Sequence, residues 1–281
     1  MLTLLKWELV KLYRRPSAYA GYVVVVALVP LIALGARHIE RNVQAGPLGR
    51  GFREDFVVAG SILNGPFLAW AVLGPTLIVL LPVLATLVGS SQVAGERYTG
   101  VLRMVLVRPV SRTAVLLSKF IVSALHAASL ALTLGVVSLG LGWVLWGGGN
   151  LAIPEPPFRE FAGAEVYQRL GLAYALAACG LVAMSSIALF FSVLLRNPAA
   201  AAGMAVAFLL ISAIALGVFE GMEWDRAVPY LITQHMMVFR EAGAIEIPRR
   251  EILRSVFALS MYTGIPLLLG LLVFGRKDVL C

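Results

Sequence analysis

Residues 95–119, GERYTGVLRMVLVRPVSRTAVLLSK, lie between two long apolar segments and decide how the chain is arranged. This stretch is the longest part of the chain that is both basic and free of membrane-length hydrophobicity. Its one acidic residue is Glu96, and its basic residues are Arg97, Arg103, Arg108, Arg112 and Lys119. A Pro-Val-Ser-Arg turn near the middle separates a short helix-like piece from the next apolar segment. We therefore expect an elbow that lies on a membrane surface and offers a docking site to a soluble partner.

The composition excludes a soluble domain. The 281 residues are 60% hydrophobic and only 14% charged, and the mean hydropathy is +0.89. Soluble domains are about half apolar and about a quarter charged. Runs of about 20 apolar residues cross a bilayer as helices that satisfy their own backbone hydrogen bonds. The length leaves room for about six such helices with modest loops, and none for a second folded domain.

The apolar runs predict an all-α membrane protein with six transmembrane helices in a single domain, residues 1–281. The expected helices cover residues 17–36, 66–93, 113–146, 169–195, 199–219 and 252–274. Pro75 and Pro82 fall inside the second of these helices. They predict a local irregularity there, because a proline ring frees backbone carbonyl groups of the preceding turn.

Residues 1–16 predict an amphipathic helix in the membrane interface. At helical spacing, the sequence separates an apolar face from a charged face. The apolar face consists of Leu2, Leu5, Leu9, Leu12 and Tyr13, and the charged face of Glu8, Lys11, Arg14 and Arg15. A basic amphipathic helix of this kind lies in the headgroup region. A plain positive flank that orients the first transmembrane helix explains the same residues.

The distribution of charge predicts that both termini are cytoplasmic. With that orientation, the internal segments are much shorter than the external ones and hold a higher density of Lys and Arg, which is the quantity that the positive-inside rule follows. All four lysines fall inside, and twelve of the fifteen acidic residues fall outside. Because the basic residues cluster beside apolar runs, the net charge of +8 does not indicate a nucleic-acid partner.

The sequence contains no recognisable motif for catalysis or for metal binding. A phosphate-binding G-x-x-x-x-G-K-[ST] loop is absent, so ATP binding of the P-loop type is not expected. The three histidines are far apart, and Cys179 and Cys281 lack ligand-like spacing. We therefore expect no catalytic residue, no metal and no enzyme activity in this chain.

His126 is the one ionisable residue well inside a predicted transmembrane helix. An ionisable group at such a position is a candidate functional residue. A proton relay or a substrate contact is one interpretation, and an interhelical hydrogen bond is the other. Ser138 and Gly142 on the same helix are small, which predicts either a close helix contact, within the subunit or across a dimer, or a place along a translocation path.

The elbow contains an acidic residue, a Gly-x-Leu, an apolar pair, a Pro-Val-Ser-Arg turn and a lysine that opens the next helix. These positions are occupied by Glu96, Gly100, Leu102, Leu106, Pro109, Val110, Ser111, Arg112 and Lys119. This order resembles the cytoplasmic signature of ABC-2 type transporter permeases. The basic N-terminal helix, the six-helix layout and the ending at residues 274–278 are similar as well, but only the elbow is specific. One difference is Val101, where the family usually has threonine.

The resemblance implies a permease subunit of an ABC exporter in the bacterial plasma (inner) membrane. It implies that a permease homodimer docks two copies of a separate ATPase subunit. ATP and Mg²⁺ then belong to that partner, and this chain has no cofactor of its own. A coupling helix at about residues 94–109 is implied to make the contact. The residues implied for it are Glu96, Arg97, Gly100, Leu102, Leu106, Arg108, Pro109, Ser111 and Arg112.

Two other classes of protein explain part of the sequence. A membrane scaffold explains the charge-poor helices but not the elbow. An intramembrane enzyme requires convergent polar residues within the helices, and His126 is the main candidate for one. A nearer alternative is a subunit that uses ATPase movement for export-linked processing or immunity. The sequence also leaves open a pairing with a sister permease in place of a homodimer.

Overall fold

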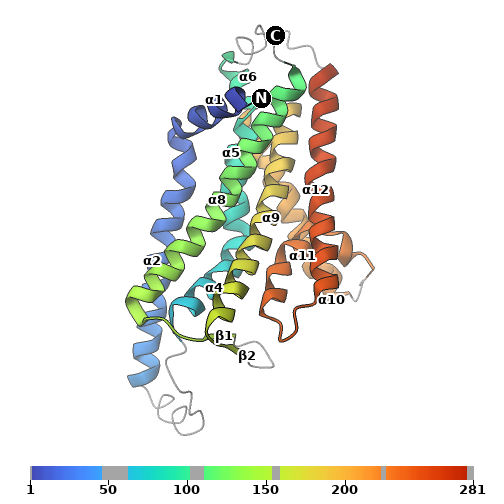
Figure 1. Ribbon diagram of the computed structural model, residues 1–281. Helices are drawn as coiled ribbons and strands as arrows, with labels where there is room; N and C mark the ends of the chain where they lie inside the picture. The colour runs from blue at the N-terminus through green and yellow to red at the C-terminus, as the bar shows by residue number, and fades with distance from the viewer. Residues whose placement is uncertain (1, 46–62, 102–110, 154–158, 223–225, 277–281) are drawn as a thin grey trace.

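Six long helices make up most of the computed structural model of the protein (Figure 1). The structure describes residues 2–45, 63–101, 111–153, 159–222 and 226–276. The helices are α2 (Pro16–Ala45), α4 continued by η1 and α5 (Gly65–Pro75, Thr76–Leu80 and Leu81–Ser91), α8 (Arg112–Trp146), α9 (Ala164–Leu194), α10 (Pro198–Gly221) and α12 (Arg249–Arg276). Each contains a segment of 22 to 35 residues that is long and apolar enough to cross a membrane, with a mean hydropathy between 2.0 and 2.4. The prediction of a mainly helical, multi-pass membrane protein with six spans is confirmed in the described part of the chain.

One end of the bundle carries two short helices. They are α1 (Leu2–Tyr13) and α6 (Ala94–Tyr98), and they lie at the same end of the bundle as the start of α8 and the end of α12 (Figure 1). We call this end the α1 end. The first and last described residues of the chain are therefore on the same side of the bundle.

The opposite end, which we call the β end, carries a small sheet. Its two strands, β1 (Leu151–Ile153) and β2 (Arg159–Phe161), pair antiparallel with Leu151 opposite Phe161. Toward this end, the chain between α10 and α12 folds into η2 (Val228–Tyr230), α11 (Ile232–Met236) and η3 (Met237–Gly243). These short helices pack against the bundle through Met236, Val238 and Phe239, which are buried.

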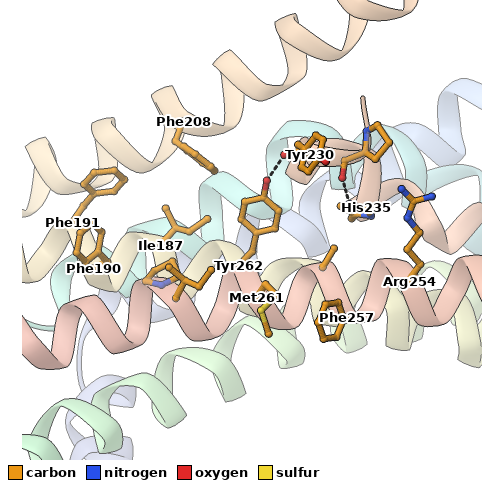
Figure 2. Close-up of a pocket in the computed structure, with 14 residues that line it drawn as sticks. Ile187, Phe190, Phe191, Phe208, Tyr230, His235, Arg254, Phe257, Met261 and Tyr262 are labelled. Carbon is orange, nitrogen blue, oxygen red and sulfur yellow. Dashed lines mark hydrogen bonds between the residues drawn. The ribbon is translucent and has the colours of Figure 1, made fainter. Parts of the chain in front are cut away.

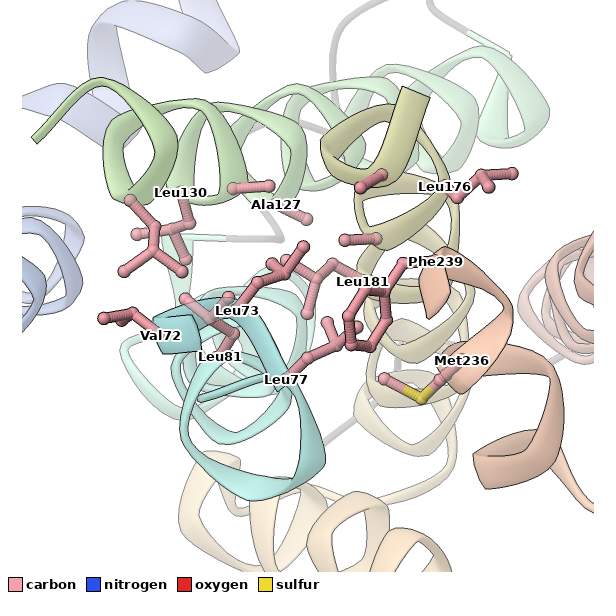
Figure 3. Close-up of a cluster of buried hydrophobic side chains, with 14 of the residues drawn as sticks. Val72, Leu73, Leu77, Leu81, Ala127, Leu130, Leu176, Leu181, Met236 and Phe239 are labelled. Carbon is pink, nitrogen blue, oxygen red and sulfur yellow. The ribbon is translucent and has the colours of Figure 1, made fainter. Parts of the chain in front are cut away.

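The central helix is α9. In its most apolar window 72% of the residues are buried, against 17% in α10 and 11% in α12. Leu73 and Leu77 of the second span, Leu130 of α8 and Phe239 of η3 pack in the same cluster as Leu181 of α9 (Figure 3). The apolar side chains on the outer faces of α10 and α12 stay exposed, as expected of helices that face lipid tails or another subunit.

A π-helical turn, η1, lies between the two prolines of the second span. It follows Pro75 directly and ends before Pro82. A proline ring lacks the backbone donor and crowds the preceding turn, and a wider turn accommodates both effects. The hydroxyl of Thr76 donates to the carbonyl oxygens of Val72 and Leu73, at 2.8 and 3.1 Å. The span therefore continues through both prolines.

Arg169 lies inside α9, although we expected that helix to begin at this residue. The helix begins one turn earlier, at Ala164. The guanidinium group donates to the carbonyl oxygen of Ala242 at 2.9 Å and to Glu165 Oε1 at 2.8 Å, and it lies 3.8 Å from the ring centroid of Phe161. These partners satisfy the buried charge. Apolar runs alone do not reveal these partners, so the sequence places the start of the helix too late.

Gly142 lies where α8 crosses the start of α4. A Cβ atom at this position would be 2.7 Å from the Cα atom of Gly65 and 3.2 Å from Cβ of Leu68. The backbones approach so closely that only glycine fits, as is common between membrane helices. The contact at Gly142 thus lies within one chain.

We predict that Gly142→Ala lowers the free energy of unfolding by about 1–3 kcal/mol, the usual cost of an overpacked contact. The matched control is Gly140→Ala on the same helix, where an added Cβ meets nothing within 4 Å. This control should unfold like the wild type or slightly later, because alanine is the better helix former. Thermal unfolding in detergent measures both variants, and equal unfolding temperatures for the two would contradict the assigned contact.

Candidate functional site

Four charged side chains from three different elements meet at the α1 end. They are Glu8 and Lys11 of α1, Glu96 of α6 and Lys119 of α8. We call them the charge cluster. Glu8, Glu96 and Lys119 are buried, with relative exposures of 5%, 1% and 0%. Lys119 is among the largest fully buried side chains that the structure describes.

Lys119 is at the centre of the charge cluster. Its Nζ atom donates to both carboxylate oxygens of Glu8, at 3.2 and 3.1 Å, and to Oε1 of Glu96. Lys11, whose side chain is 29% exposed, donates to the same oxygen of Glu96 from the outer side. Two lysines therefore face two glutamates, and the formal charges of the four side chains sum to zero.

This balance is what makes the burial possible. A single buried charge costs several kcal/mol, and removal of its partner leaves that cost uncompensated. Burial alone raises the pKa of Glu96, but the charge of Lys119 and the hydrogen bonds from Lys11 and Lys119 outweigh it and hold this pKa below its ordinary value. Glu96 therefore stays ionised at neutral pH and keeps both ion pairs.

The face of α1 that packs on the bundle is both apolar and charged. Leu5, Leu9 and Leu12 pack in a small cluster with residues of other helices, and Glu8 is buried beside them. Our expectation that Glu8 belongs to a solvent-facing charged side of α1 is therefore wrong. The reason is Lys119, which offers a buried partner that the sequence of α1 alone does not reveal.

The short helix α6 is also held from the side of α9. The backbone N–H groups of Val93 and Ala94 donate to Ser192 Oγ, at 3.0 and 2.8 Å. The Ser192 hydroxyl in turn donates to the carbonyl oxygen of Ser90 at 2.5 Å. Arg97 donates to the carbonyl oxygen of Val193 at 3.3 Å. Three helices, α1, α8 and α9, thus fix the position of α6.

The expected coupling helix at residues 94–109 is not one continuous helix. Its first part, α6, ends at Tyr98. Gly100 then adopts a left-handed backbone with φ of +77°, a conformation that glycine adopts most easily, and it breaks the helix. Four further residues implied by the resemblance lie outside the described residues, namely Leu102, Leu106, Arg108 and Pro109.

Ser111 and Arg112 form the start of α8. Ser111 is its N-cap, and the hydroxyl accepts a hydrogen bond from the backbone N–H of Ala114 at 3.3 Å. Arg112 donates to the carbonyl oxygen of Gly275 at 3.2 Å. Ser111 therefore caps the start of α8, and Arg112 ties that start to the end of α12.

His126, Ser138 and Gly142 lie along α8, away from the charge cluster. Nδ1 of His126 is 3.2 Å from the hydroxyl oxygen of Tyr22 on α2. Ser138 donates to the carbonyl oxygen of its own helix at Leu134, at 2.6 Å, and its Oγ is 3.3 Å from the hydroxyl of Tyr174 on α9. The contacts of His126 with Tyr22 and of Ser138 with Tyr174 join neighbouring helices. Among the described residues, no group of three His, Cys, Asp or Glu side chains is placed to hold a metal ion.

The fold and the charge cluster define a six-span membrane protein whose N-terminal helix is joined to the bundle by buried ion pairs. The chain belongs to DUF2705, a family of proteins of unknown function, whose model matches residues 53–280. It is also similar to the uncharacterized protein YhcI of Bacillus subtilis (strain 168), with 24% identity over 205 residues. That match covers 72% of this chain, and it spans only 65% of the length of YhcI. The family match includes Glu96 and Lys119 but not α1.

The charge cluster can be tested with a double-mutant cycle on Glu8 and Lys119. Lys119→Met leaves two buried carboxylates to one lysine, and we expect it to lower the free energy of unfolding by about 3–5 kcal/mol. The double variant Glu8→Gln/Lys119→Met keeps one lysine, Lys11, paired with one glutamate, Glu96. Its loss of unfolding free energy should therefore be smaller than the sum of the losses in Glu8→Gln and Lys119→Met. Thermal or denaturant unfolding of the purified protein measures all three variants.

The control for lost positive charge is Lys6→Met, because Lys6 lies exposed on α1. This variant should unfold like the wild type, since surface charges contribute little to stability. Additive losses in the cycle, or a Lys119→Met variant as stable as the control, would show that the charge cluster does not hold α1 on the bundle.

Proposed function

We propose that this chain is the permease subunit of an ATP-binding cassette exporter, and that a separate ATPase subunit docks at the elbow at the α1 end. The observation that carries the proposal is the charge cluster. The ion pair between Glu96 and Lys119 joins α6, at the start of the elbow, to α8, at its end. The order of residue types in the elbow, which resembles that of ABC-2 type permeases, supports the same assignment.

In this proposal the α1 end faces the cytoplasm of a bacterial cell, and α1 lies along the membrane interface. The distribution of charge supports this orientation under the positive-inside rule. The basic residues described at the α1 end are Lys6, Lys11, Arg14, Arg15, Arg97, Arg112, Lys119, Arg196 and Arg276. Glu8 and Glu96, the acidic residues described there, are paired within the charge cluster.

The proposed mechanism is a mechanical connection. Closure of two ATPase subunits on ATP displaces the elbow of each permease, and the buried ion pairs pass that displacement to α8 and α1. α8 has 35 residues, or about 52 Å of helix, which exceeds the hydrocarbon thickness of about 30 Å. A displacement at its start therefore reaches the β end. Two permeases and two ATPase subunits form the proposed transporter, and ATP and Mg²⁺ are held by the ATPase.

The test is coexpression of the tagged chain with the P-loop ATPases encoded beside its gene, followed by affinity purification and an ATPase assay. We expect the wild type to recover an ATPase at one copy per permease. Gly100→Pro should lose it, because proline cannot adopt the positive φ at this position and also removes the N–H that donates to Arg97.

Gly147→Pro is the matched control at the β end. Gly147 also has a positive φ, of +82°, and its N–H also donates to a backbone carbonyl, that of Trp143. The local strain is the same, but the site is remote from the elbow, so the ATPase should still be recovered. Equal recovery of the ATPase with Gly100→Pro and Gly147→Pro would show that the elbow is not the docking site. Recovery of no P-loop protein with the wild type would favour the scaffold or the intramembrane enzyme.

A further inference from the structure

A pocket with a volume of about 640 Å³ lies on the flank of the bundle between α9, α10 and α12 (Figure 2). Its lining is mainly aromatic and aliphatic, with Phe190 and Phe191 from α9, Phe208 from α10, and Phe257, Met261 and Tyr262 from α12. On the outer face of α12, Phe257 is 65% exposed and Met261 is 43% exposed. The pocket is therefore open on the side of α12 that the rest of the bundle leaves uncovered.

The two ends of this pocket differ in polarity. The phenylalanines of α9 and α10 lie at one end, and His235 and Arg254 at the other (Figure 2). The polar end adjoins a second pocket of about 500 Å³, which shares Pro229, His235 and Arg254 with the first. This second pocket is lined by the polar side chains Gln234, Arg240, Glu241, Glu251 and Ser255. An apolar cavity thus leads into a charged one.

The length of the apolar part matches one leaflet of a bilayer. The lining residues on α12 run from Arg254 to Ile265 and Pro266. At 1.5 Å per residue, Arg254 and Ile265 are about 16 Å apart along the helix axis. Half of a hydrocarbon core of about 30 Å is about 15 Å. A molecule whose head lies at Arg254 therefore has its apolar part within one leaflet.

Arg254 is the residue at the polar end that can bind a ligand. The ring nitrogens of His235 are already used, because Nε2 is 2.9 Å from the carbonyl oxygen of Pro229 and Nδ1 is 3.2 Å from Ser255 Oγ. The hydroxyl of Tyr262 donates to the carbonyl oxygen of Tyr230. Arg254 is exposed and makes no hydrogen bond or ion pair with any residue that the structure describes.

We propose that this pocket binds a phospholipid of the surrounding bilayer, with an acyl chain along the phenylalanines and the phosphate on Arg254. A guanidinium group binds phosphate oxygens through two parallel charge-assisted hydrogen bonds. Glu251 in the adjoining pocket suits the amine of a zwitterionic headgroup. The inference concerns a lateral lipid site on α12 and does not depend on the proposed transport function.

The test uses a phosphatidylethanolamine probe with a photoactivatable diazirine in its acyl chain, added at limiting concentration to the purified full chain. After irradiation, mass spectrometry of proteolytic peptides locates the label. We expect the label on the peptides of α9 and α12 that carry Phe190 and Met261. Arg254→Ala should reduce it about tenfold, because it removes a charge-assisted hydrogen bond.

Arg250→Ala is the matched control. Arg250 lies one turn earlier on α12, is also exposed and lines neither pocket, so its removal should leave the labelling unchanged. A diacylglycerol probe with the same acyl chains but no phosphate should label the pocket as weakly as the phospholipid labels Arg254→Ala.

Three outcomes would overturn the proposal. Equal labelling by the two probes would show that the pocket does not recognise the phosphate. Labelling spread over the exposed faces of α2 and α10, and unchanged in Arg254→Ala, would indicate ordinary lipid contact. Exclusion of the probe together with cross-linking of α12 to a second copy of the chain would assign the pocket to a dimer interface.

Discussion

The arrangement of the α1 end depends on one buried lysine. Lys119 has no exposed surface, and its charge is balanced by Glu8 on one side and Glu96 on the other. Neither carboxylate belongs to the helix of Lys119, so the three charges can be buried only if α1, α6 and α8 are assembled together. The leucines of α1 supply apolar contact, but the ion pairs determine which residues face one another. The position of α6 relative to α8 follows from this requirement.

The two features of interest lie at different places in the bundle. The charge cluster is at the α1 end, where the chain is basic and the elbow begins and ends (Figure 1). The aromatic pocket is on the outer side of α12, with its polar end toward the segment between α10 and α12. α9 packs against both α8 and α12 and is the most deeply buried span. α8 also contacts the outer helices α2 and α12 directly.

The spans could be predicted from the sequence, because each crosses the membrane as a nearly uncharged run of about 20 residues or more. Glu96 could also be singled out, since it is the one acidic residue of a basic elbow. The ion pair of Lys119 with Glu8 could not be predicted, because the two residues are 111 positions apart and residue periodicity carries no information about such pairs. The presence of Lys119 in an otherwise apolar helix was the available signal, since a buried lysine requires a carboxylate. The start of α9 could not be placed correctly for a similar reason. The carbonyl oxygen of Ala242 in η3, which accepts from the buried Arg169, is distant in the sequence.

The most direct test of the account is a spin-label distance between α6 and α8. The labels replace Tyr98 and Leu132, which are 77% and 65% exposed, in a chain whose two cysteines have been substituted. The account predicts one narrow distance distribution in the wild-type background and a clearly broader one in Lys119→Met, because the ion pair that joins α6 directly to α8 is then lost. Distributions of equal width in the two backgrounds would contradict the claim that the charge cluster holds the elbow to α8.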